Sequence, residues 1–148
     1  MRSIVAALVS CGLTACSAAG PAPLDTKSES CAWCRMAVSD PRFAAQLVAP
    51  SEEPRFFDDI GCLASYLGSK RELPKGARAY VADHRHQVWI DATTAVYARV
   101  ESLETPMGSH LVAHTDAASR AADAEARTGK PLAAPEVFGP SGPPGMKR

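Results

Sequence analysis

Sulfur-bearing side chains lie close together at one point of the chain. Cys31, Cys34 and Met36 fall within the six-residue segment Cys31-Ala32-Trp33-Cys34-Arg35-Met36. Zinc is bound by thiolate, imidazole and carboxylate, and calcium and magnesium prefer oxygen, whereas thiolate together with thioether suits the soft copper(I) ion. This spacing therefore predicts a copper(I) site at Cys31, Cys34 and Met36.

The cysteines allow three other interpretations, two of which can also involve Cys62. A structural disulfide could form within the Cys31–Cys34 pair, or between one of them and Cys62, in an oxidising compartment. A thioredoxin-like redox pair needs a strand before it and a helix after it, and the sequence favours neither. The three cysteines with one histidine could also form a zinc site.

Length and charge exclude several classes of protein. The chain has 148 residues, which suits one ordinary domain, and 46% of them are hydrophobic, which excludes wholesale disorder. Lys and Arg number 16, as do Asp and Glu, so the net charge is zero and no basic block occurs. We therefore expect no nucleic-acid partner.

The amino-terminal segment has the pattern of an export signal. Residues 1–15 carry one arginine, an apolar run too short to span a bilayer permanently, and small residues. Leu13-Thr14-Ala15-Cys16 resembles the lipobox of bacterial lipoproteins, which implies cleavage before Cys16 and lipidation of Cys16. Because Ser17 follows, the outer membrane is the expected location of the anchor. Residues 16–30 are predicted to form a flexible tether, so the folded part would face the periplasm.

The remaining sequence has two similar halves. The first half is predicted to contain a helix that begins after Asp58 or Asp59 and ends near Ser69, with strands at 42–49, 54–57, 77–82 and 88–91. The second half repeats this order, with a helix from Thr115 or Asp116 to Arg127 and strands at 97–102, 109–114 and 135–138. These patterns predict an α+β fold of two ββαβ-like units that share a core, over residues 31–138, followed by a disordered tail at 139–148.

Five segments in this order resemble the NosL family of accessory proteins for nitrous oxide reductase: CAWCRM, FFDDIGCLASYL, YVADH, WIDA and TPMGSHLVAH. The resemblance covers roughly Cys31 to Phe138. It implies two ββαβ units related in fold to organomercurial lyase. It also implies a copper(I) chaperone that supplies the copper–sulfide centre of the reductase. The implied partners are nitrous oxide reductase or its assembly transporter, and the membrane through the lipid anchor.

The resemblance also implies a set of ligands. Cys31, Cys34 and Met36 match the sulfur motif of the family, and Met107 lies in a Thr-Pro-Met-Gly segment that recurs there. Whether Met107, Cys62 or a histidine such as His110 completes the site stays open at this point. Arg35 stands where the family often has glycine, and its cation is expected to favour the ionised thiols.

The expected activity is carriage of copper rather than catalysis. The sequence has no Ser/His/Asp arrangement and no glycine-rich phosphate loop. The alternatives are a membrane-anchored thiol–disulfide oxidoreductase and a copper chaperone for another extracytoplasmic copper protein.

Overall fold

The first half of the chain forms a four-stranded antiparallel sheet with one helix. The computed structural model describes residues 20–69 and 72–146, so the predicted export signal and Cys16 lie outside the described residues. The elements are β1 (Ala45–Val48), β2 (Arg55–Phe57), α1 (Ile60–Gly68), β3 (Arg78–Ala82) and β4 (Trp89–Asp91). The sheet has the order β2-β1-β3-β4.

The second half repeats this arrangement on a smaller scale. Its elements are β5 (Val96–Arg99), β6 (Leu111–His114), α2 (Ala117–Ala122) and β7 (Lys130–Leu132), and α3 (Ala134–Phe138) follows. The second sheet has the order β6-β5-β7. In each half the first strand lies between the second strand and the strand that follows the helix. The prediction of an α+β fold with two ββαβ units is therefore confirmed.

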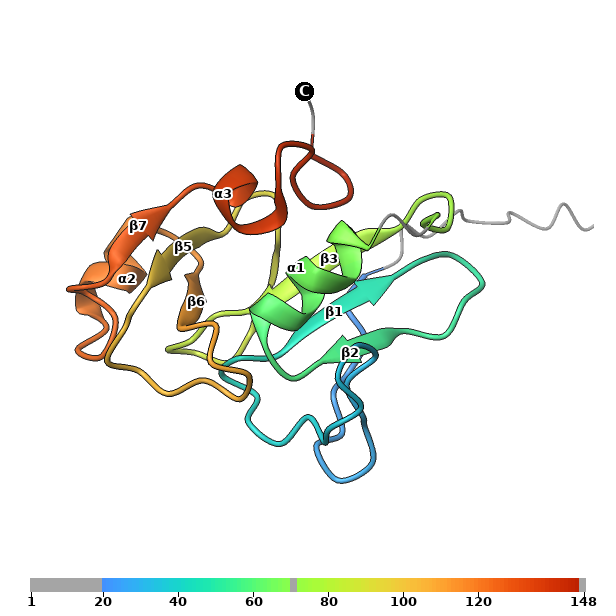
Figure 1. Cartoon of the computed structure of the whole chain (residues 1–148), viewed down its shortest axis with the longest axis horizontal. Coiled ribbons are helices and arrows are strands. Elements are labelled where there is room, and N and C mark those ends of the chain that lie inside the picture. Colours follow the sequence, from blue (N-terminus) through green and yellow to red (C-terminus); the bar gives the residue numbers. More distant parts are fainter. Residues whose placement is uncertain (1–19, 70–71, 147–148) are drawn as a thin grey trace, which may run out of the picture.

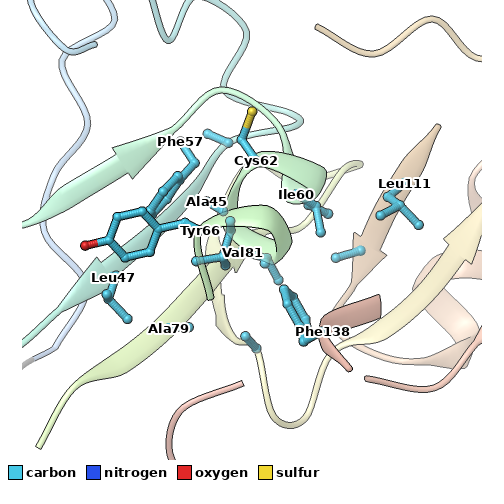
Figure 2. Packing of buried hydrophobic residues seen from close by; sticks show 14 of the residues in the cluster. Ala45, Leu47, Phe57, Ile60, Cys62, Tyr66, Ala79, Val81, Leu111 and Phe138 are labelled. Carbon is cyan, nitrogen blue, oxygen red and sulfur yellow. The ribbon is translucent and has the colours of Figure 1, made fainter. Parts of the chain in front are cut away.

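The two halves share one hydrophobic core. Figure 1 shows α1 across β1 and β3, with the sheet of β5 and β6 beside them. One cluster of buried residues contains Leu47, Phe57, Ile60, Val81, Tyr97, Leu111 and Phe138, and Figure 2 shows part of it. The Tyr97 hydroxyl donates to the Ala92 carbonyl at 2.7 Å, and its ring packs edge-on against Phe138 with the ring centres 5.5 Å apart. These apolar contacts are what hold the two units in one body.

Two predictions about the second half were wrong. The helix predicted to reach Arg127 ends at Ala122, because Asp123 has extended backbone angles and its carboxylate bonds the rings of His84 and His114. The strand predicted at 135–138 is the helix α3, whose first turn holds Pro135 and in which the Glu136 carboxylate accepts the Ala133 N–H. The last strand is instead β7, at the edge of its sheet, where a proline is tolerated.

Segments at both ends of the described chain contact this body. Ala22, in the predicted tether, exchanges two hydrogen bonds with the buried side chain of Gln46, at 2.8 and 3.1 Å. Leu24 packs against the core, and Met146 in the predicted tail does the same. Among the described residues, no helix has the length and apolar character needed to cross a membrane.

Candidate metal centre

Three thiols and one carboxylate meet where the first cysteine motif lies against the start of α1. The Sγ atoms of Cys31, Cys34 and Cys62 and a carboxylate oxygen of Asp58 all lie within 4.8 Å of one another. Cys31, Cys62 and Asp58 are buried, and Cys34 is half-buried. The described structure holds all three cysteines as free thiols rather than as a disulfide. This is the largest concentration of soft donor atoms in the described chain.

A tight loop positions the first two cysteines. The Cys31 N–H donates to the Met36 carbonyl at 2.8 Å, and the Arg35 N–H donates to the Cys31 carbonyl at 3.0 Å. Arg35 closes the loop with a left-handed backbone, at φ 70°. The Ala32 N–H donates to Phe56 in β2 at 2.8 Å, so the loop is attached to the edge of the first sheet. As a result Cys31 is fully buried in the core while Cys34 stays at its edge.

The turn from β2 into α1 supplies the other two members of the cluster. Asp59 caps the helix, because its Oδ1 accepts the Gly61 N–H at 2.6 Å. Asp58, which the sequence also allowed as the cap, takes the other role and joins the thiols. Cys62 follows in the first turn of α1, and Figure 2 shows its side chain leaving the helix on the side away from Phe138.

Asp59 also attaches the loop that carries Met107. Its Oδ2 accepts the Thr105 hydroxyl at 2.7 Å and the Met107 N–H at 3.1 Å. The same loop approaches α1 closely, since a Cβ atom added at Gly61 would lie 2.7 Å from the Cβ of Ser109. One buried carboxylate therefore fixes the helix start and the Thr-Pro-Met-Gly loop together.

Two thiols of the cluster, those of Cys34 and Cys62, have raised pKa values. Burial raises the pKa of Cys34 to about 11, and Asp58 adds to this because its Oδ2 accepts the Cys34 thiol at 3.3 Å. Burial also raises the pKa of Cys62, more strongly. The expectation that Arg35 would favour ionised thiols is therefore wrong for Cys34, because desolvation and a neighbouring carboxylate dominate. A cation that binds here must displace thiol protons.

The predicted site residues separate into two groups. Cys31 and Cys34 lie in the cluster, and so does Cys62, which the sequence left open. Met36 and Met107 are exposed, by 53% and 46%, on segments that hydrogen-bond to the cluster or to its neighbour Asp59. Neither methionine is therefore buried with the thiols.

None of the histidines joins the cysteine cluster in the described part of the chain. The ring of His110 instead has its Nδ1 2.9 Å from the Leu103 carbonyl. The fourth member is Asp58, which sequence reasoning assigned only to helix capping. The sequence did show that Asp58 lies between the end of β2 and the helix cap Asp59, at a corner of the fold.

The fold and this site define a protein of two ββαβ units with a buried thiol-rich cluster that could hold a metal ion. A profile of the NosL family matches residues 21–138, which is most of the chain, and the chain therefore belongs to the NosL family. NosL proteins are copper-binding accessory proteins, which agrees with the soft donors found here. No curated protein gives a significant sequence match to this chain.

Proposed function

We propose that this protein carries copper(I) at Cys31, Cys34 and Cys62. The observation that supports this most directly is the convergence of three free thiols within 4.8 Å in a largely buried position. Copper(I) is soft and prefers thiolate and thioether donors to oxygen and nitrogen. Burial also excludes water from the ion, which limits exchange of the bound copper(I) with solvent.

Asp58 is proposed as a proton acceptor rather than as a copper ligand. A carboxylate is a hard donor, which copper(I) binds weakly beside thiolates. Asp58 Oδ1 is buried without a hydrogen-bond partner among the described residues, and its Oδ2 already accepts the Cys34 thiol. The carboxylate is thus placed to receive the Cys34 proton when copper binds.

Met36 and Met107 are proposed to complete the site from its solvent side. Both thioethers are exposed, and both belong to segments bonded to the cluster or to Asp59. A neutral thioether binds copper(I) more weakly than a thiolate does, so an ion held partly by thioethers can be exchanged with another protein. This arrangement suits delivery of copper rather than permanent storage.

The proposed recipient is nitrous oxide reductase or its assembly transporter, with the copper used to build the copper–sulfide centre. Membership of the NosL family supports this proposal. We further propose that lipidation of Cys16 holds the protein at a membrane facing the periplasm, as the lipobox-like segment suggests. The protein would then load its client as a carrier and would not be an enzyme.

The copper site is tested by competition with a copper(I) chelator. The reduced soluble chain beginning at Ser17 is expected to bind one copper(I). Cys31→Ser, Cys34→Ser and Cys62→Ser should each weaken binding at least about tenfold. Full affinity in Cys31→Ser or Cys34→Ser would refute the assignment.

The methionines need a separate comparison. Met36→Leu and Met107→Leu should weaken copper(I) binding while leaving the fold intact, because both side chains are exposed. Met146→Leu is the matched control, since Met146 packs against the core and lies outside the proposed site. If Met146→Leu weakened copper(I) binding as much as Met36→Leu and Met107→Leu do, the assignment of Met36 and Met107 as ligands would be wrong.

The alternative of a thiol–disulfide oxidoreductase is less well supported. Redox cysteines attack as thiolates and have lowered pKa values, whereas burial raises the pKa of Cys34 here to about 11. An insulin-reduction assay distinguishes the two functions. We expect stoichiometric copper(I) capture without turnover, and catalytic insulin reduction would favour the oxidoreductase.

A further inference from the structure

A second group of potential metal ligands lies where the two halves meet, away from the cysteines. His84 follows β3, His114 ends β6, and Asp123 follows α2. All three are buried, with exposures of 3%, 0% and 6%. One nitrogen of each imidazole and one carboxylate oxygen of Asp123 lie within 4.8 Å of one another. The proposed copper function makes no use of this group.

Both histidines direct a ring nitrogen at the same oxygen atom. His84 Nδ1 lies 2.7 Å from Asp123 Oδ2, and His114 Nε2 lies 2.9 Å from it. The opposite nitrogens, His84 Nε2 and His114 Nδ1, are buried without a hydrogen-bond partner among the described residues. Both inner nitrogens, His84 Nδ1 and His114 Nε2, therefore lie next to the same carboxylate oxygen, so that one ion could contact all three groups.

We propose that His84, His114 and Asp123 bind a zinc ion. Two neutral imidazoles and a carboxylate form a donor set of intermediate softness, which zinc binds in proteins. Zinc–nitrogen and zinc–oxygen bonds are about 2.0–2.2 Å long, so donors around a tetrahedral ion lie about 3.3 Å apart. The distance from each histidine nitrogen to Asp123 Oδ2 therefore needs to increase by only about half an ångström for the ion to bind between them.

Zinc binding gives each ring proton a defined position. Each histidine binds zinc as a neutral imidazole through its inner nitrogen and carries its ring proton on the outer nitrogen. His84 Nε2 then faces the Glu125 carboxylate, whose Oε2 is 3.8 Å away. Asp123 and Glu125 together offset the charge of the divalent ion. His114 Nδ1 gains no partner among the described residues, which lowers the expected affinity about 10- to 100-fold.

The zinc ion would join the two ββαβ units. His84 belongs to the first unit, and His114 and Asp123 belong to the second. The units already touch here, because the His84 N–H donates to the Ala113 carbonyl at 2.9 Å. A metal that binds the folded state alone raises its stability by mass action. At a hundredfold excess over the dissociation constant, the melting temperature should rise by about 5–10 °C.

The two metals should be separated by donor type. Copper(I) prefers the thiols of the first cluster, and once these hold copper(I) the second cluster is the donor set that remains for zinc. One member of each cluster lies next to the turn between the second strand and the helix of its half. Asp58 directly follows β2, and His114 is the last residue of β6.

The test uses the soluble chain beginning at Ser17, with Cys31, Cys34 and Cys62 all changed to serine so that thiols cannot bind zinc. Equilibrium dialysis against zinc chloride should give one zinc per chain, with the rise in melting temperature stated above. His114→Phe and Asp123→Asn in this background should weaken zinc binding at least about tenfold. His86→Gln is the matched control and should bind zinc normally, because His86 is exposed and bonds only neighbouring polar groups.

Cobalt(II) gives a second readout that does not depend on the triple serine variant. The intact copper(I)-loaded chain should show d–d absorption of a tetrahedral cobalt site without thiolate charge-transfer bands, and His114→Phe should abolish this absorption. Absence of zinc binding, or zinc and cobalt binding that survives both His114→Phe and Asp123→Asn, overturns the proposal. Copper(I) affinity is measured independently, so failure here leaves the proposed copper function unchanged.

Discussion

Two adjacent carboxylates at the start of α1 are expected to differ widely in their effect on stability when each is changed to asparagine. Asp59 accepts hydrogen bonds from Gly61, Thr105 and Met107, at 2.6, 2.7 and 3.1 Å. Asp58 accepts one bond, from the Cys34 thiol, and its other oxygen has no partner among the described residues. We predict that Asp59→Asn strongly destabilises the metal-free fold and that Asp58→Asn barely changes its stability.

The magnitude follows from the donors left without an acceptor. An asparagine at position 59 can still cap α1 through its oxygen, but its amino group would face the Thr105 hydroxyl and the Met107 N–H. Two hydrogen bonds to a charged acceptor are lost, each worth about 1.5–3 kcal/mol, so the expected loss is about 3–6 kcal/mol. Asp58→Asn removes a poorly bonded buried charge, so we expect a change of about 1 kcal/mol or less.

The assay is urea and thermal unfolding of the reduced, metal-free chain, followed by circular dichroism. The loss in Asp59→Asn corresponds to a fall in melting temperature of at least about 6 °C. Thr105→Val, which removes one of the three donors, should fall between the two aspartate variants. Equal losses in Asp58→Asn and Asp59→Asn, or a larger loss in Asp58→Asn, would refute the division of roles between them.

Three further predictions concern close packing and charge. Gly61→Ala should destabilise the fold by about 1–3 kcal/mol, because the added Cβ meets the loop that carries Ser109. Gly68→Ala in the same helix meets no neighbouring atom and should be neutral or slightly stabilising. Thermal unfolding compares the two variants. Burial opposes ionisation of Asp83, but hydrogen bonds outweigh it and lower its pKa to about 2, so the folded state should lose about 2 kcal/mol as the pH falls from about 4 to 2. Asp83→Asn should flatten this part of the stability–pH curve, and an unchanged curve would contradict the assignment. Finally, Asp58→Asn should lower the pKa of Cys34, because the carboxylate adds to the effect of burial; thiolate ultraviolet absorbance measures it, and an unchanged pKa would show that Asp58 does not contribute.

Local patterns were sufficient to predict most of the fold. The apolar segments that became β1, β2 and β3 were visible as short runs between turn residues, and the helix α1 followed from its cap and its apolar face. The end of α2 could not be predicted in this way. Residues after Ala122 have ordinary helical propensity, but the Asp123 side chain bonds His114 in β6 and His84, which lies in the other half of the chain. A tertiary contact therefore overrides the local preference.

The candidate metal centre was predictable only in part, for a similar reason. Cys31 and Cys34 are close in sequence, so their spacing alone indicated a shared site. Cys62 and Asp58 join them because the motif loop bonds β2 through Ala32 and the chain then turns into α1. No residue pattern encodes that contact directly. The methionines matched a family motif, but their exposure depends on loop geometry that the sequence does not specify.

The turn between the second strand and the helix occurs twice in this chain, before α1 and before α2. Each corner carries a residue that caps the following helix, Asp59 or Asp116, close to a residue that faces a candidate site, Asp58 or His114. Scaffold and reactive groups therefore share the same few positions. Engineering new donors at either corner requires that the capping aspartate be kept while its neighbour is changed.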